Sequence, residues 1–215
     1  MYEVILFDLD GTLLDTLDDL HVSVNAALAA FSYPPRTREE VRAFVGNGIA
    51  KLIERAIGSK TPDFDEVLQA FKTHYFENCM VKTKPYAGIV ELLRTLQAQG
   101  IKAAVVSNKA DAAVQTLSKA YFGDLLCMSV GEDEGRGIRK KPAPDTLLQV
   151  LQTLGVSKEK TVYVGDSEVD IQTAQNAGIP CISVTWGFKD KEFLVENGGQ
   201  IFADSTEELL SLCIR

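Results

Sequence analysis

The stretch ILFDLDGTLLDT, residues 5–16, decides the fold. Its opening apolar run predicts a buried strand, and two aspartates one residue apart, Asp8 and Asp10, follow that run at once. Gly11 comes next and gives the chain freedom to bend, so that both carboxylates can face the same cleft. The stretch therefore predicts a strand that ends by directing two carboxylates at one place.

Four further runs rich in valine and isoleucine predict strands at residues 102–108, 125–130, 160–166 and 179–185. Helical periodicities lie between them. Residues 88–99, for example, carry apolar side chains at helical spacing and meet Gly100, which predicts the end of a helix. The alternation predicts an α/β fold with a Rossmann-like parallel sheet core and helices on both faces.

The first two predicted strands are separated by about 90 residues, far more than a single crossover helix needs. Four apolar stripes at helical spacing fall in this interval, within residues 17–31, 41–45, 49–57 and 64–75. Thr37 and Glu40 have the spacing of a capping box ahead of the second stripe. We therefore expect residues 16–81 to form a small α-helical cap domain, inserted into an α/β core of residues 1–15 and 82–215.

The composition is that of a globular protein, with 215 residues, of which 46% are hydrophobic and 24% charged. A net charge of -8 argues against nucleic-acid and membrane partners, which usually require a basic face. The four cysteines are widely separated, so we expect thiols rather than disulfides or a zinc site. With no signal segment or long apolar run, a cytoplasmic location is expected, as a monomer or a homodimer.

Polar residues stand where the predicted strands end, and ligands of parallel α/β sheets gather outside the carboxyl ends of strands. Besides the first aspartate pair, these residues are Ser107 with Asn108, the run KKPAPD at 140–145, and GDSEVD at 165–170. Each alone has an ordinary explanation as a turn, a helix cap or a solvated loop, and the loop reading also suits Arg136, Arg139 and Lys140. Together they predict one site.

These residues resemble the motifs of haloacid dehalogenase-like superfamily phosphatases that carry a helical cap. The run DLDGT, residues 8–12, resembles the first motif, Ser107 the second, Lys141 the third and GDSEVD the fourth. The segment FVGNGIAKLIERAI, residues 44–57, is most similar to the phosphoglycolate phosphatase group. The resemblance implies a magnesium-dependent phosphomonoester hydrolase acting on a small phosphorylated metabolite, with 2-phosphoglycolate as the first choice.

The resemblance also implies roles for individual residues. Asp8 is expected to be the nucleophile that forms an aspartyl-phosphate, and Asp10 the general acid and then the general base. The expected magnesium ligands are Asp8, the backbone carbonyl of Asp10, and Asp166, while Asp170 would support the metal site or Lys141. The expected phosphate or substrate contacts are Thr12, Gly46, Asn47, Gly48, Ser107, Asn108 and Lys141.

Several alternatives stay open at this point. An acidic Asp10 argues against the dehalogenases and phosphonatases of the superfamily, which lack this aspartate. A phosphomutase of the β-phosphoglucomutase type, a pyrophosphatase, a general sugar phosphatase and a binding module without turnover all remain, although Thr12 favours a phosphatase over a mutase. The stretch Gly46–Gly48 is either an ordinary turn between helices or a substrate loop.

Overall fold

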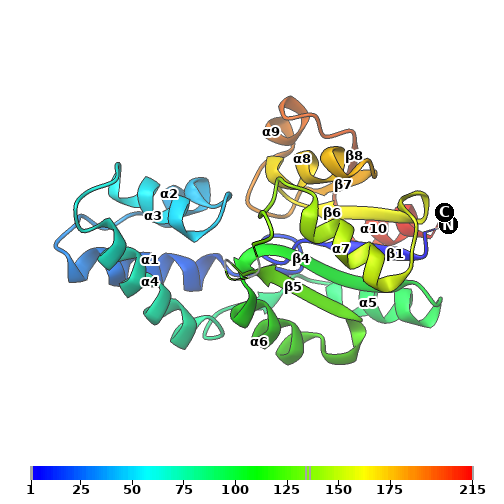
Figure 1. Ribbon diagram of the computed structural model, residues 1–215, viewed down its shortest axis with the longest axis horizontal. Helices are drawn as coiled ribbons and strands as arrows, with labels where there is room; N and C mark the ends of the chain where they lie inside the picture. The colour runs from blue at the N-terminus through cyan, green and yellow to red at the C-terminus, as the bar shows by residue number, and fades with distance from the viewer. Residues whose placement is uncertain (1, 134, 136, 215) are drawn as a thin grey trace. The chain divides into compact units, whose positions relative to one another are not determined.

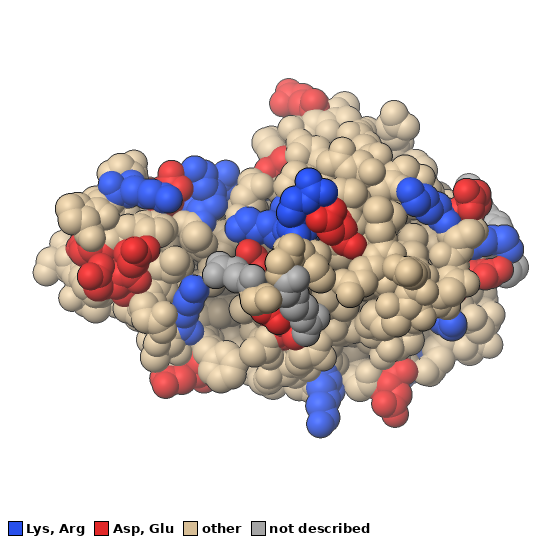
Figure 2. Space-filling model, in the orientation of Figure 1, with Lys and Arg blue, Asp and Glu red and all other residues tan. Residues whose placement is uncertain are grey.

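The computed structural model describes residues 2–133, 135 and 137–214 (Figure 1). The chain divides into two compact units, which we call the sheet unit (Met1–Leu14 with Pro85–Arg215) and the helical unit (Asp15–Lys84). The predicted boundaries of the cap domain, residues 16 and 81, remain a prediction, because these units are defined by compactness alone. Lysine and arginine side chains lie among aspartates and glutamates on the face seen in Figure 2.

The sheet unit is built on a six-stranded sheet in the order β5-β4-β1-β6-β7-β8. Its strands are β1 (Val4–Phe7), β4 (Lys102–Ala110), β5 (Met128–Glu132), β6 (Thr161–Gly165), β7 (Cys181–Val184) and β8 (Ile201–Ala203). All neighbouring strands are parallel, and Phe7 of β1 lies opposite Val105 and Val164. The parallel α/β fold is confirmed. Strand β8 was not predicted, because three residues are too few to show a pattern.

Helices cover both faces of this sheet (Figure 1). The helices of the sheet unit are α5 (Ile89–Ala98), α6 (Asp111–Tyr121), α7 (Asp145–Leu154), α8 (Glu168–Ala177), α9 (Lys191–Glu196) and α10 (Thr206–Cys213), with short 3₁₀ turns at Gly123–Leu125 and Lys158–Lys160. Val4 and Leu6 pack with Leu147 of α7 and Ala174 of α8. Because side chains alternate along a strand, the residues between them face the opposite side, which α5 and α6 cover.

The helical unit contains α1 (Leu17–Ala30), α2 (Arg38–Phe44), α3 (Ile49–Ile57) and α4 (Phe64–Asn78). The predicted capping box is confirmed, since Glu40 N–H donates to Thr37 Oγ1 at 3.1 Å and Thr37 N–H donates to Glu40 Oε2 at 2.7 Å. Among the described residues, no helix is long and apolar enough to span a membrane. The four cysteines, all within the described part of the chain, form no disulfide.

Two short strands, β2 (Leu14–Asp15) and β3 (Lys84–Pro85), pair where the chain passes between the units. Within the helical unit, Asp19 is 3% exposed, and its carboxylate accepts hydrogen bonds from the N–H groups of Lys82 at 3.0 Å and Thr83 at 2.8 Å. The first turn of α1 therefore fixes the segment by which the chain leaves the unit.

Asp19→Ala is expected to lower the free energy of unfolding by about 3 kcal/mol, because two backbone N–H groups lose a charged acceptor in a buried place. Urea denaturation measures this loss. Asp18→Ala is the matched control, since Asp18 stands on the same turn and forms an exposed ion pair with Arg38, worth less than about 1 kcal/mol. Equal losses in the two variants would contradict the role of Asp19.

Candidate active site

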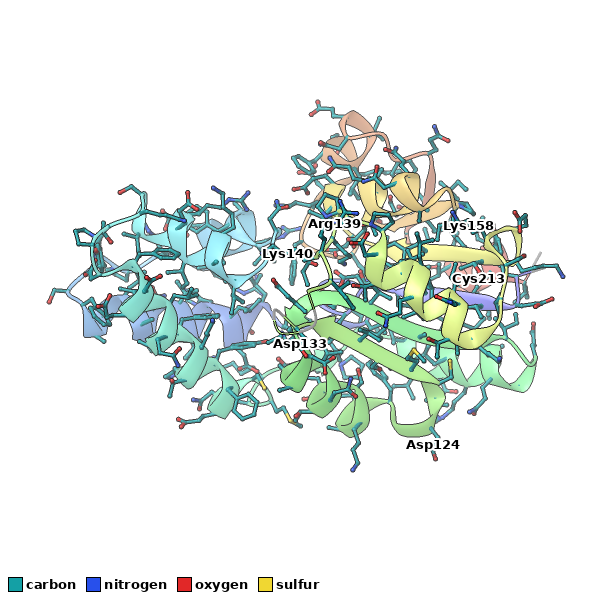
Figure 3. All side chains as sticks on the ribbon, in the orientation of Figure 1. Asp124, Asp133, Arg139, Lys140, Lys158 and Cys213 are labelled. Carbon is teal, nitrogen blue, oxygen red and sulfur yellow. The ribbon has the colours of Figure 1, made fainter. Side chains whose placement is uncertain are left out.

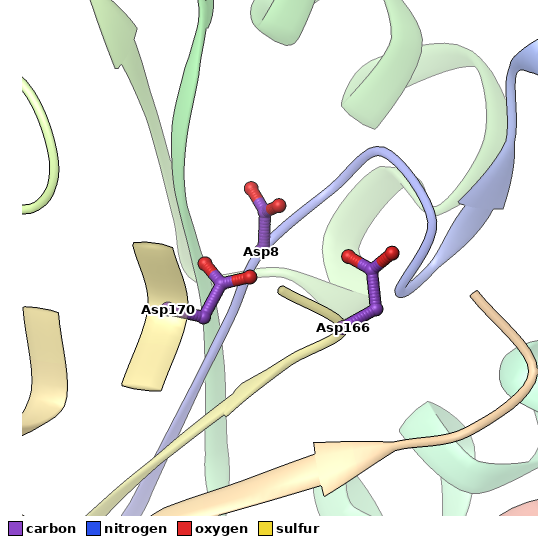
Figure 4. Close-up of side chains that lie close together, drawn as sticks. All are labelled: Asp8, Asp166 and Asp170. Atoms are coloured by element: carbon purple, nitrogen blue, oxygen red, sulfur yellow. The ribbon is translucent and has the colours of Figure 1, made fainter. Parts of the chain in front are cut away.

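Three buried aspartates meet at the carboxyl ends of β1 and β6 (Figure 4). Asp8 follows β1, Asp166 follows β6, and Asp170 lies in the first turn of α8. One carboxylate oxygen of each lies within 4.8 Å of the other two. Phe7, the last residue of β1, pairs with Val164, one residue before the end of the parallel strand β6, so the residues that follow the two strands lie at the same edge of the sheet.

Two glycines make room for Asp166. A Cβ atom at Gly11 would collide with the Asp166 carboxylate, and Gly11 also adopts a φ of +81°, which other residues rarely do. A Cβ atom at Gly187 would collide with both the Asp166 side chain and the Gly11 carbonyl oxygen. The backbone therefore closes around this carboxylate from two sides.

Asp166 is also oriented by hydrogen bonds to both of its carboxylate oxygens. Thr12 Oγ1 donates to Oδ1 at 3.3 Å, and the N–H of Phe188 donates to Oδ2 at 2.7 Å. The indole Nε1 of Trp186 donates to the Thr12 carbonyl oxygen at 3.1 Å. Thr12, predicted as a phosphate contact, is fully buried here with its hydroxyl on Asp166.

Lys141 supplies a positive charge between two of the aspartates. Its side chain is 4% exposed, and Nζ lies 2.7 Å from Asp170 Oδ1 and 2.9 Å from Asp8 Oδ1. The same Nζ donates to the hydroxyl of Tyr163 on β6 at 2.9 Å. Burial alone would lower the pKa of Lys141, but the carboxylates of Asp170 and Asp8 outweigh it and hold that pKa well above its usual value.

Both carboxylate oxygens of Asp170 are held by hydrogen bonds or by an ion pair. Its Oδ2 accepts from the N–H of Ser167 at 3.1 Å and from the Ser167 hydroxyl at 2.6 Å, while its Oδ1 faces Lys141. The hydroxyl of Tyr163 donates to the Val106 carbonyl at 2.9 Å and lies 3.2 Å from Asp170 Oδ1. The support predicted for Lys141 thus takes the form of an ion pair, held by the start of α8 and by β6.

The three aspartates carry more negative charge than Lys141 balances. Burial raises the pKa of Asp8 to about 6, against the opposing effect of Lys141. Burial also raises the pKa of Asp166 well above its usual value, and Asp170 and Asp8 add to the shift. With all three aspartates ionised, the single ammonium would leave an excess of two negative charges, which a hard divalent cation, with its preference for carboxylate oxygens, would offset. The residues present therefore fit such a cation.

Ser107 and Asn108 stand near the end of β4, beside β1 in the sheet. Asn108 Nδ2 donates to the Lys141 carbonyl at 2.9 Å, and the Lys141 N–H donates to Asn108 Oδ1 at 2.8 Å. This side chain therefore fixes the peptide that carries Lys141. Ser107 is buried, and together with Asn108, Gly131 and Lys141 it lines a small pocket.

Lys109 is a site residue that the sequence analysis missed. Its Nζ donates to both carboxylate oxygens of Asp10, at 2.9 and 3.0 Å. The Lys109 side chain is 4% exposed and that of Asp10 17% exposed. The available signal was a lysine directly after two predicted site residues, Ser107 and Asn108, at the end of a predicted strand.

Three of the remaining candidate residues belong to the helical unit. Gly46, Asn47 and Gly48 form the turn between α2 and α3 in the helical unit, with φ values of +119°, +65° and +85°. Arg139 and Lys140, labelled in Figure 3, form ion pairs with Asp145 and Glu132. Arg136 lies outside the described residues.

The sequence is similar to those of known hydrolases. Residues 5–184 match the family model described as haloacid dehalogenase-like hydrolase. A phosphoglycolate phosphatase of Pseudomonas putida is 33% identical over 98% of this chain and 79% of its own length. A phosphoglycolate phosphatase of Aquifex aeolicus is 36% identical over 86% of this chain and 85% of its own length.

Solved structures share the fold over nearly the whole chain. A protein of Lactobacillus delbrueckii subsp. bulgaricus, provisionally assigned as a phosphoglycolate phosphatase, has a TM-score of 0.94 and 36% identity, covering 99% of this chain and 98% of its own. CbbY of Rhodobacter sphaeroides, solved in complex with phosphate, has a TM-score of 0.79 and 27% identity, covering 97% of this chain and 96% of its own.

Proposed function

The chain belongs to the haloacid dehalogenase-like hydrolase family, and on that premise we propose that it is a magnesium-dependent phosphatase with 2-phosphoglycolate as its substrate. The cluster of Asp8, Asp166 and Asp170 around Lys141 carries the proposal for the chemistry. The phosphoglycolate phosphatases among the relatives support the choice of substrate.

The residues of the sheet unit can perform both halves of the reaction. A carboxylate oxygen of Asp8 attacks phosphorus, the bond from phosphorus to the leaving oxygen breaks, and Asp10 gives that oxygen its proton. Water then attacks the aspartyl-phosphate, Asp10 takes a proton from it, and phosphate leaves with Asp8 restored. Dividing the reaction matters because phosphate monoester hydrolysis can require accelerations on the order of 10²¹-fold.

Asp8, Asp166 and the backbone carbonyl of Asp10 would hold Mg²⁺. When bound, the ion offsets the charge of Asp8 and of the phosphate oxygens, which lets two anions approach each other. Lys141 and the Ser107 hydroxyl supply further positive charge and a hydrogen-bond donor for those oxygens, and Asp170 keeps Lys141 in place. In the helical unit, the Gly46–Gly48 turn is the proposed contact for the rest of the substrate, since its backbone can approach a small ligand closely.

The test is a comparison of kcat/KM with Mg²⁺ for 2-phosphoglycolate, pyrophosphate, glucose 6-phosphate, β-glucose 1-phosphate and nucleoside monophosphates. We expect 2-phosphoglycolate to be the best substrate of the panel. A higher value for a sugar phosphate or a nucleotide would overturn the proposed substrate. Conversion of β-glucose 1-phosphate to glucose 6-phosphate without phosphate release would point to a mutase, and no turnover of any phosphate ester would leave only a binding module.

Asp166→Ala is expected to raise the Mg²⁺ concentration needed for half-maximal activity at least about 10-fold, because it removes a buried, oriented oxygen ligand. Mg²⁺ should also raise the melting temperature of the natural protein but not of this variant, since an ion that binds only the folded state stabilises it. Asp204→Ala is the control, because Asp204 is exposed and pairs with Lys191. An unchanged response to Mg²⁺ in Asp166→Ala would contradict the ligand assignment.

A further inference from the structure

Lys109 places a second buried ammonium at the site, apart from the one that serves the nucleophile. The charge of Lys141 is engaged by Asp8 and Asp170, whereas that of Lys109 lies against both oxygens of Asp10. Since Asp8 is the group that meets phosphorus and Asp10 the group that meets the leaving oxygen, the two lysines serve opposite ends of the substrate. Lys109 therefore stands at the leaving-group end.

The distances place Lys109 within reach of a short leaving group. Asp10 must come within about 3 Å of the leaving oxygen to protonate it, and Nζ of Lys109 is 2.9 and 3.0 Å from the Asp10 oxygens. The ammonium is thus no more than about 6 Å from the leaving oxygen. In 2-phosphoglycolate one methylene group separates the ester oxygen from the carboxylate carbon, so the carboxylate falls inside this range.

Burial makes the position selective for charge. The Lys109 side chain is 4% exposed, and a buried ammonium is stabilised by a charged acceptor far more than by a neutral one. Asp10 keeps 17% of its side chain exposed, so an incoming carboxylate can reach the pair and share the ammonium. We propose that Lys109 binds an anionic substituent on the leaving group and so selects phosphate esters of small hydroxy acids. This inference rests on the proposed function and names the residue that sets its substrate class.

The experiment compares two substrates of nearly equal shape, 2-phosphoglycolate and its neutral amide, 2-phosphoglycolamide. The natural protein is expected to show a kcat/KM at least about 10-fold higher for the carboxylate. In Lys109→Met this preference is expected to disappear, so that kcat/KM for the two substrates becomes about equal, chiefly through a higher KM for 2-phosphoglycolate, and Lys109→Arg should retain most of the preference. Lys140→Met, which removes a more exposed lysine of the neighbouring loop, should leave the preference unchanged.

The outcomes separate recognition from positioning. If Lys109 only held Asp10 in place, Lys109→Met would lower kcat/KM equally for both substrates, and that result overturns the proposal. Equal kcat/KM values of the natural protein for the two substrates would overturn the proposal as well. This second test needs no variant, so it holds even if Lys109→Met fails to fold. Failure of the proposed function has a different signature, namely no phosphate release from either substrate or from p-nitrophenyl phosphate with Mg²⁺.

Discussion

Asp8→Asn is expected to lower the rate of phosphate release by about 10⁴-fold or more, because an amide of the same shape cannot attack phosphorus as a carboxylate does. The variant should remain folded, since Lys141 keeps Asp170 at 2.7 Å and the Tyr163 hydroxyl at 2.9 Å. Steady-state phosphate release measures the first effect and thermal melting the second.

A chemical trap makes the test of Asp8 sharper. Acid quenching during turnover of ³²P-labelled substrate should leave label on the natural protein as an aspartyl-phosphate, and none on Asp8→Asn. Asp145→Asn is the control, since Asp145 is an aspartate of the sheet unit paired with Arg139 outside the cluster. Substantial turnover by Asp8→Asn, or label on it, would end the aspartyl-phosphate mechanism.

Asp10→Asn is expected to lower kcat for 2-phosphoglycolate by about 10²- to 10⁴-fold, the usual contribution of a general acid or base. The effect should depend on the leaving group. Nitrophenolate leaves without a proton, so p-nitrophenyl phosphate should still phosphorylate Asp8 in this variant and give a burst of one nitrophenolate per site. Slow turnover should follow, because the second step still lacks its base.

The burst distinguishes the chemical role of Asp10 from a structural one. If Asp10 served only to hold Lys109 in place, its replacement would not separate the first step from the second, and no burst would appear. The natural protein provides the reference. It should turn over both substrates continuously and show no burst of nitrophenolate followed by a slow phase. Rapid-mixing absorbance of nitrophenolate is the measurement.

The central strands and the positions of the aspartates could be predicted because their signals are local. The apolar run of β1 precedes Asp8 directly, and in a parallel sheet every such strand ends at the same edge. The short run GDSEVD places Asp166 directly after β6 and Asp170 in the first turn of α8, so one strand-to-helix connection supplies two carboxylates. The capping box of α2 is likewise contained in four residues.

What the sequence did not reveal depends on contacts between distant segments. Lys109 directly follows the predicted strand of residues 102–108, and only the fold shows that its side chain meets Asp10, 99 residues earlier. Likewise, the indole of Trp186 donates to the carbonyl of Thr12, 174 residues earlier in the chain. No periodicity encodes such pairs, because they follow from the order of strands in the sheet.

The central place of β1 has a consequence for biosynthesis. β1 is the first strand to be synthesised, yet its neighbours β4 and β6 end at Ala110 and Gly165, so Asp8 is made long before the strands that surround it. The helical unit, by contrast, is one continuous segment of local contacts, which favours early folding. Limited proteolysis of ribosome-bound chains of increasing length would then find the helical unit protected first, with the unpaired β1 as the segment most in need of a chaperone.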